Sequence, residues 1–92
     1  MPARFSLGKI VATPGAIEAL QAGMITAGLF LGRHVQGDWG ELDKEDKRAN
    51  EQALKDGSRL LSAYKVPNTG VKLWIITEAD RSATTLLLPE EY

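Results

Sequence analysis

The hydrophobic pattern of the chain changes period after Gly57, and this change constrains the fold more than any other feature. Residues 60–66 and 71–76 alternate with a period of two, and the turn Pro67-Asn68-Thr69-Gly70 separates them. A second polar turn, residues 78–82, leads into the run 84–88, which Pro89 ends. Such runs joined by short turns are typical of strands, so residues 60–88 are predicted to form a three-stranded antiparallel meander.

The alternation assigns apolar residues to both faces of this predicted sheet. One face holds Leu61, Ala63, Trp74, Ile76 and Leu87, and the other holds Leu60, Tyr64, Leu73, Ile75, Leu86 and Leu88. An antiparallel sheet with one face in water normally shows polar residues on that face. We therefore expect the second face to be covered by the N-terminal strand region or by another subunit, and we predict a homodimer.

The N-terminal half is predicted to contain one short strand and then helices. Residues 9–13 form an apolar run with β-branched residues, which is typical of a strand buried on both faces. Thr13 and Asp43 are good N-caps, and Gly57 is a good helix end, so helices are predicted over 14–22, 24–36 and 44–56. The 92 residues are thus expected to fold as a single α+β domain, 1–92, with a short N-terminal strand, two or three helices and the C-terminal meander.

Composition and charge argue against several classes of function. The eleven basic and twelve acidic side chains are mixed along the chain, whereas a nucleic-acid-binding protein concentrates Lys and Arg into a patch, so no strong nucleic-acid binding is expected. The chain has no cysteine and one histidine, and it has no glycine-rich phosphate loop, so we predict no metal site and no cofactor.

The expected location is cytoplasmic, without membrane contact. The longest apolar run, residues 22–31, is shorter than the ~20 residues that cross a bilayer. The first residues also lack the basic, apolar and small-residue regions of a signal peptide.

The segment 34–40 is the main candidate for chemistry, because it brings an imidazole, a carboxylate and an indole together. His34 and Asp38, with Glu78 or Tyr64 from the sheet, are candidates for an acid–base site if they converge on a pocket. The structural alternative is that Asp38 forms a turn and Trp39 folds back onto the core. We favour this alternative and expect a buried Trp39.

A second group of polar residues lies in the turn 78–82. Arg81 is a fixed positive charge that can hold a carboxylate or a phosphate, although Glu78 and Asp80 can also neutralise it within the turn. The residues predicted to bind a partner are Trp39, Arg59, Tyr64, Asp80 and Arg81.

Several segments together resemble a family of short bacterial proteins. They are Phe5-Ser-Leu-Gly8, Val11-Ala-Thr-Pro-Gly-Ala16, Arg33-His34 with Gly37-Asp-Trp-Gly40, Gly57-Ser-Arg-Leu-Leu-Ser-Ala-Tyr64 and Trp74-Ile-Ile-Thr-Glu-Ala-Asp-Arg-Ser82. Proteins of this family occur on plasmids, integrative elements and phages, and are labelled plasmid-related or, loosely, type I restriction enzyme subunits. The resemblance covers nearly the whole chain and implies a mobile-element context, but it transfers no functional residue.

Two functional hypotheses follow from these observations. The first is an accessory, non-enzymatic binding protein of mobile-element type, including an anti-defence role, that acts through a protein partner. The alternative is a small-molecule-binding domain or acid–base enzyme with its site around His34, Asp38 and the C-terminal sheet. An enzyme requires a concave pocket with convergent polar groups, whereas a binding protein presents an exposed apolar patch.

Overall fold

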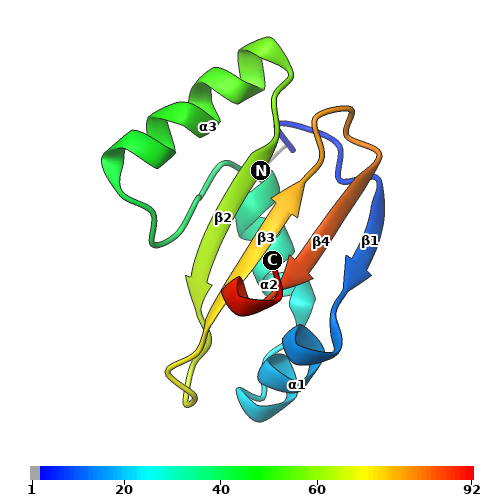
Figure 1. Cartoon of the computed structure of the whole chain (residues 1–92), viewed down its shortest axis with the longest axis vertical. Helices are drawn as coiled ribbons and strands as arrows, with labels where there is room; N and C mark the ends of the chain where they lie inside the picture. The colour runs from blue at the N-terminus through cyan, green and yellow to red at the C-terminus, as the bar shows by residue number, and fades with distance from the viewer. Residues whose placement is uncertain (1–2) are drawn as a thin grey trace.

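The computed structural model of the chain describes residues 3–92, which form three α-helices, a four-stranded sheet and a short 3₁₀ helix (Figure 1). The elements in chain order are β1 (Lys9–Ala12), α1 (Pro14–Ala22), α2 (Ala27–Val35), α3 (Lys44–Asp56), β2 (Leu60–Lys65), β3 (Lys72–Thr77), β4 (Ala83–Leu87) and η1 (Pro89–Glu91). The α+β class predicted from the sequence is therefore confirmed. Among the described residues, no single helix is long and apolar enough to cross a membrane, although α1 and α2 reach that length and composition together, across a 108° bend.

The sheet is mixed, and this corrects the prediction of a three-stranded antiparallel meander. The strand order is β1-β4-β3-β2, in which β3 pairs antiparallel with β2 and β4, and β1 pairs parallel with β4. The expectation that residues 9–13 are buried on both faces was also wrong, because β1 is an edge strand and Lys9, Ile10 and Val11 are exposed. An apolar run has the same local pattern in a central strand and in an edge strand, so it does not show which strands pair with it.

Local signals set the helix ends. The Thr13 side chain accepts a hydrogen bond from the Ala16 N–H at 3.1 Å, and the Asp43 side chain accepts one from Asp46 at 2.8 Å, as expected of N-caps. Gly57 ends α3 with a left-handed φ of 79°, which costs glycine little. The predicted helix 24–36 is shorter in the structure, because Met24 has a φ of 56° and the chain turns before α2 begins.

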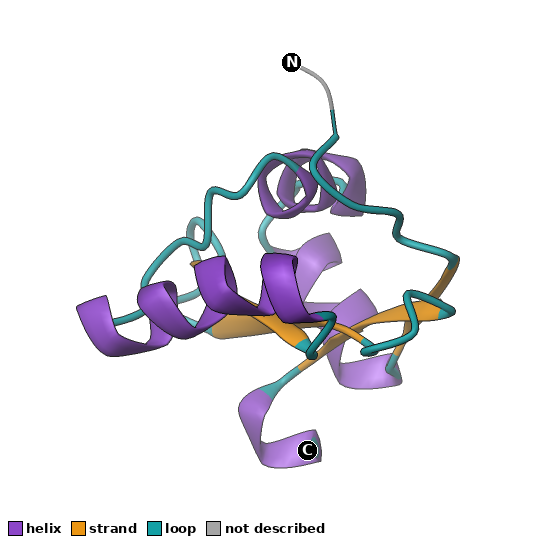
Figure 2. Cartoon of the chain, turned by 90° about the horizontal axis from the view of Figure 1, so that it is seen from above, coloured by secondary structure: helices purple, strands orange, loops and turns teal. Residues whose placement is uncertain are grey.

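The main core lies between α1, α2 and one face of the sheet (Figure 2). Its buried residues are Ala16, Leu20, Phe30, Tyr64, Val66, Leu73, Ile75 and Leu86. The strand registers place Leu60, Tyr64, Leu73, Ile75 and Leu86 on this face, as the alternation predicted. A second, smaller cluster joins Trp39 to Ala53 of α3 and Leu60 of β2.

The other face of the sheet carries η1, whereas the sequence led us to expect cover from the N-terminal strand region or from another subunit. Figures 1 and 2 show η1 on the side opposite α2. The Tyr92 ring lies edge-on to Trp74 of β3, with 5.8 Å between the ring centroids. The Glu91 carboxylate accepts hydrogen bonds from the Thr13 hydroxyl at 2.5 Å and from the Leu88 N–H at 2.8 Å, so the tail is tied to the end of β1.

Candidate functional site

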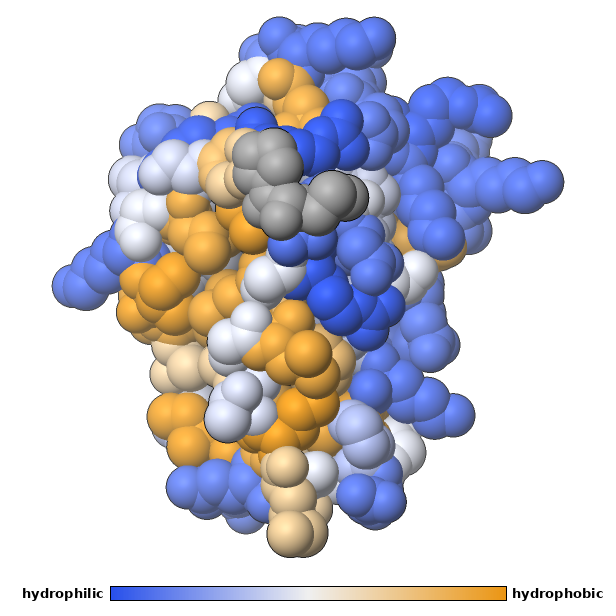
Figure 3. Space-filling model, turned by 180° about the vertical axis from the view of Figure 1, so that it is seen from behind, coloured by the Kyte–Doolittle hydropathy of each residue, from blue (hydrophilic) through white to orange (hydrophobic). Residues whose placement is uncertain are grey.

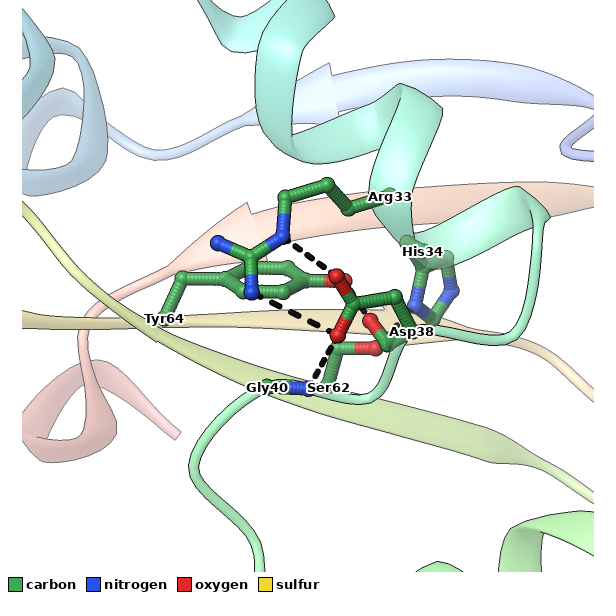
Figure 4. Close-up of polar contacts among 6 residues, drawn as sticks. All are labelled: Arg33, His34, Asp38, Gly40, Ser62 and Tyr64. Carbon is green, nitrogen blue, oxygen red and sulfur yellow. Dashed lines mark hydrogen bonds and ion pairs between the residues drawn. The ribbon is translucent and has the colours of Figure 1, made fainter.

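The predicted residues His34, Asp38, Trp39 and Tyr64 lie close together where the end of α2 and the following loop meet β2. Figure 4 shows the polar contacts of this cluster. His34 is the last but one residue of α2, and it is fully buried against the strands. Asp38, Trp39 and Gly40 follow in the loop, and Ser62 and Tyr64 project from the same face of β2.

Both ring nitrogens of His34 are bound to hydroxyl groups of the sheet. Nδ1 lies 2.5 Å from the Ser62 Oγ, and Nε2 lies 2.9 Å from the Thr77 Oγ1. The Thr77 Oγ1 lies 2.8 Å from the Thr84 Oγ1, which in turn is 2.7 Å from the backbone oxygen of Leu7. The chain of hydrogen bonds thus runs from β2 across β3 and β4 to the N-terminal segment.

The direction of each hydrogen bond follows from the last acceptor. The Leu7 carbonyl can only accept, so the Thr84 hydroxyl donates to it and must accept from Thr77. The Thr77 hydrogen is then used, and Thr77 accepts from a protonated Nε2 of His34. In a neutral ring Nδ1 is then the unprotonated nitrogen and accepts from the Ser62 hydroxyl. A neutral imidazole thus satisfies every hydrogen bond of the network, and neither ring nitrogen is free for a substrate.

The surroundings of His34 also oppose a positive charge on the ring. Phe5 and Trp39 both meet the imidazole edge-on, with ring centroids 5.1 Å and 5.8 Å away. Burial among these groups lowers the pKa of His34 from 6.5 to about 4. His34 is consequently neutral at physiological pH and acts as a structural member of the core.

Asp38 points away from His34 and pairs with Arg33. The Arg33 Nε donates to the Asp38 carboxylate at 2.7 Å, and the Gly40 N–H donates to it at 3.3 Å (Figure 4). The Arg33 hydrogen bond, followed by that of Gly40, holds the pKa of Asp38 below its usual range. The two side chains are 42% and 52% exposed, so the pair orders the loop more than it stabilises the fold.

Tyr64 connects this loop to the main core. Its hydroxyl donates to the backbone oxygen of Asp38 at 2.5 Å, and burial raises its pKa to about 12. The Phe30 ring stacks parallel to it at 4.9 Å, and the Arg33 guanidinium lies 4.6 Å from its centroid. Tyr64 is therefore held by contacts to its ring and at its hydroxyl group, and with 1% of its surface exposed it is not an open binding surface.

Trp39 is buried, as expected, with 4% of its surface exposed. Its indole Nε1 donates to the Glu51 carboxylate of α3 at 2.9 Å. The same carboxylate accepts two hydrogen bonds from Arg4, at 2.9 Å and 3.1 Å. The indole thus joins the loop, α3 and the N-terminal segment, a role for Arg4 and Glu51 that no local sequence pattern indicated.

Gly40 allows the loop to pair with the edge of β2. The Glu41 N–H donates to the Ala63 oxygen at 2.7 Å, and the Ala63 N–H donates to the Trp39 oxygen at 3.1 Å. Gly40 has a φ of 75°, and a Cβ at this position would overlap the Ala63 carbonyl oxygen. Only glycine combines this conformation with so close an approach.

The other predicted polar residues lie away from this cluster. The Arg81 guanidinium donates to four backbone oxygens, those of Ala53, Ser58, Glu78 and Ala79, rather than to a carboxylate. The Asp80 carboxylate accepts from the Ser82 N–H at 3.0 Å, and bonds to Ser82 lower its pKa. Arg81 therefore organises the β3–β4 turn and the end of α3.

Two remaining candidates, Glu78 and Arg59, are exposed at separate places. Glu78 lies in the β3–β4 turn, and within residues 3–92 no hydrogen bond joins it to His34 or Asp38. Arg59 lines a hollow of about 190 Å³ between α3 and β2, and its guanidinium lies 5.5 Å from the Tyr92 ring centroid. The described part of the chain also holds no group of three or more acidic or histidine side chains that fits a metal ion.

Comparison with known protein families, with characterised proteins and with solved structures finds no match to this chain.

Proposed function

We propose that this chain is a non-enzymatic binding domain that acts through a protein partner. The observation that carries the proposal is a set of exposed apolar side chains on the helical side of the molecule. Ile17 of α1, Leu29 of α2 and Met24 between the helices are 46%, 54% and 90% exposed. We call these three residues the helical apolar patch. Figure 3 shows hydrophobic residues over much of this side of the molecule.

The distribution of charge supports the same proposal. Residues 9–35, which form β1, α1 and α2, contain three charged residues, Lys9, Glu18 and Arg33. Residues 44–56, which form α3, contain eight charged residues. Figure 3 shows hydrophilic residues along the right-hand side of the molecule, away from the hydrophobic area. Exposed apolar groups gathered on a side with little charge are typical of protein-binding surfaces.

The biological setting of the proposal comes from the family resemblance. A small binding domain carried by a plasmid, integrative element or phage acts on a macromolecule of the element or of the host, and an anti-defence function is one form of this activity. The acid–base alternative receives no separate support, because the hydroxyl groups of Ser62 and Thr77 occupy both nitrogens of His34.

The test is co-purification of the full chain from its native host, with two variants that each introduce a glutamate. Leu29→Glu changes the helical apolar patch, whereas Lys47→Glu changes an exposed residue of α3. We expect a stoichiometric protein to accompany the wild type and Lys47→Glu, and to be lost from Leu29→Glu. A partner that Leu29→Glu retains would contradict the proposal, as would a small molecule as the only stoichiometric companion.

A further inference from the structure

The outer edge of β1 presents backbone groups that the sheet does not use. The Lys9 and Thr13 N–H groups donate to the oxygens of Ser82 and Leu86, each at 3.0 Å, so these residues face β4. Peptide groups alternate in direction along a strand, so Ile10 and Ala12 direct their N–H and C=O groups away from the sheet. In Figure 1 no described segment lies beyond β1 on this side.

This edge is only partly protected from pairing. Proteins block such edges with very short strands, lysine, proline, a bulge or a covering segment, and the described residues show the first two, because β1 is four residues long and begins with Lys9. The β1 strand contains one charged residue, Lys9, while Ile10 and Val11 are 45% and 43% exposed. The edge is thus both apolar and rich in free hydrogen-bonding groups.

We infer that β1 pairs with the β1 strand of a second copy of this chain, antiparallel and about a two-fold axis at Val11. Ile10 of each copy then lies opposite Ala12 of the other, in two hydrogen-bonded pairs that together make four backbone hydrogen bonds. Val11 meets Val11 of the second copy in the central pair. The two four-stranded sheets form one continuous sheet of eight strands.

The distribution of charge at this edge favours a second copy over an unrelated strand. In this register Lys9 lies opposite Thr13 of the second copy. The Thr13 hydroxyl donates to the Glu91 carboxylate at 2.5 Å, so Lys9 lies beside Glu91 of the other copy. The two-fold symmetry produces this pair of opposite charges twice. No like charges face each other along the pair, and a foreign strand has no reason to supply a matching lysine at this place.

This inference does not rest on the proposed function, because it uses β1 and not the helical apolar patch. Its first test is the molar mass of the full chain in solution at about 100 µM, a concentration suited to a small interface. We expect twice the chain mass of 10.0 kDa for the wild type and the single mass for Val11→Lys, which sets two ammonium groups face to face. Gln52→Lys is the matched control, because Gln52 is an exposed residue of α3 that lies off the edge and the variant gains the same charge, and it should stay dimeric.

A second test uses the absence of cysteine from the sequence, which makes single-cysteine variants unambiguous. The central pair of the proposed register brings two Cα atoms to about 4.5 Å, within the range of a disulfide. Val11→Cys should therefore form a dimeric disulfide at least about tenfold faster than Gln52→Cys, whose exposed cysteine meets that of a second copy only by collision. Circular dichroism of each variant checks that the fold is kept.

Three results would overturn the inference. They are a monomeric wild type at about 100 µM, a Val11→Lys variant that stays dimeric, and equal rates of disulfide formation in the two cysteine variants. If the edge instead binds a strand of another protein, this chain alone stays monomeric. Hydrogen exchange at the Ile10 and Ala12 amides then becomes slow only after that protein is added.

Discussion

Acid is expected to destabilise this protein through His34, at a pH well above the range of its carboxylates. The pKa of His34 is lowered from 6.5 to about 4 in the folded state, because the ring is buried. The unfolded chain therefore takes up a proton first as the pH falls. The stability due to the neutral ring is full above pH 6.5 and is lost progressively between pH 6.5 and about 4.

The size of this loss can be worked out from the two pKa values. One pKa unit corresponds to about 1.4 kcal/mol, so the complete loss is about 3 kcal/mol, of which about 2 kcal/mol has gone by pH 5. Protonation also removes the acceptor of the Ser62 hydroxyl, which acts in the same direction. The carboxylates with lowered pKa values, such as Asp38 and Glu51, titrate below this range, so the interval from pH 7 to 5 isolates the histidine.

The assay is urea unfolding at pH 7, 6 and 5, for the wild type and for His34→Gln. The glutamine amide can replace the hydrogen bond to Thr77 but does not titrate. We expect the variant to be less stable at pH 7 by about 1–2 kcal/mol, and its free energy of unfolding to be constant down to pH 5. A wild-type loss of less than about 0.5 kcal/mol between pH 7 and 5, or the same pH dependence in His34→Gln, would refute this role of His34.

Substitutions at two positions, Trp39 and Gly40, test the loop that follows His34, and urea unfolding measures their effects. Trp39→Ala should lower the free energy of unfolding by about 3–5 kcal/mol, because the indole is buried and binds Glu51, and Trp39→Phe should lower it less. A loss below about 1 kcal/mol for the alanine variant would show that Trp39 is not structural. Gly40→Ala should destabilise the fold by more than about 2 kcal/mol, because the added Cβ meets the Ala63 carbonyl oxygen. Gly32→Ala is the control, because Gly32 lies in α2 and no atom lies within 4 Å of an added Cβ. It should be neutral or stabilise the fold by up to about 1 kcal/mol. Equal effects of the two glycine substitutions would contradict the proposed reason for Gly40.

The sequence by itself determined those features that depend on neighbours a few residues away. Thr13 and Asp43 cap helices because their side chains reach an N–H three residues on, and Gly57 ends α3 because it tolerates a positive φ. The period of two after Gly57 likewise placed Tyr64, Leu73 and Ile75 on one face of the sheet. For Trp39 the short loop left two possibilities, burial against the core or exposure as an interface anchor, and burial was the one expected.

The tertiary structure decided which distant segments lie side by side. The run 9–13 has the same local pattern whether it is a central or an edge strand, and only the packing of α1 and α2 on the sheet brings it parallel to β4. The partners of His34 are 28 and 43 residues away, so no spacing near the histidine could indicate that Ser62 and Thr77 would occupy its nitrogens. Strand pairing and buried polar networks depend on long-range contacts, and the local patterns of a single sequence do not show which distant residues come into contact.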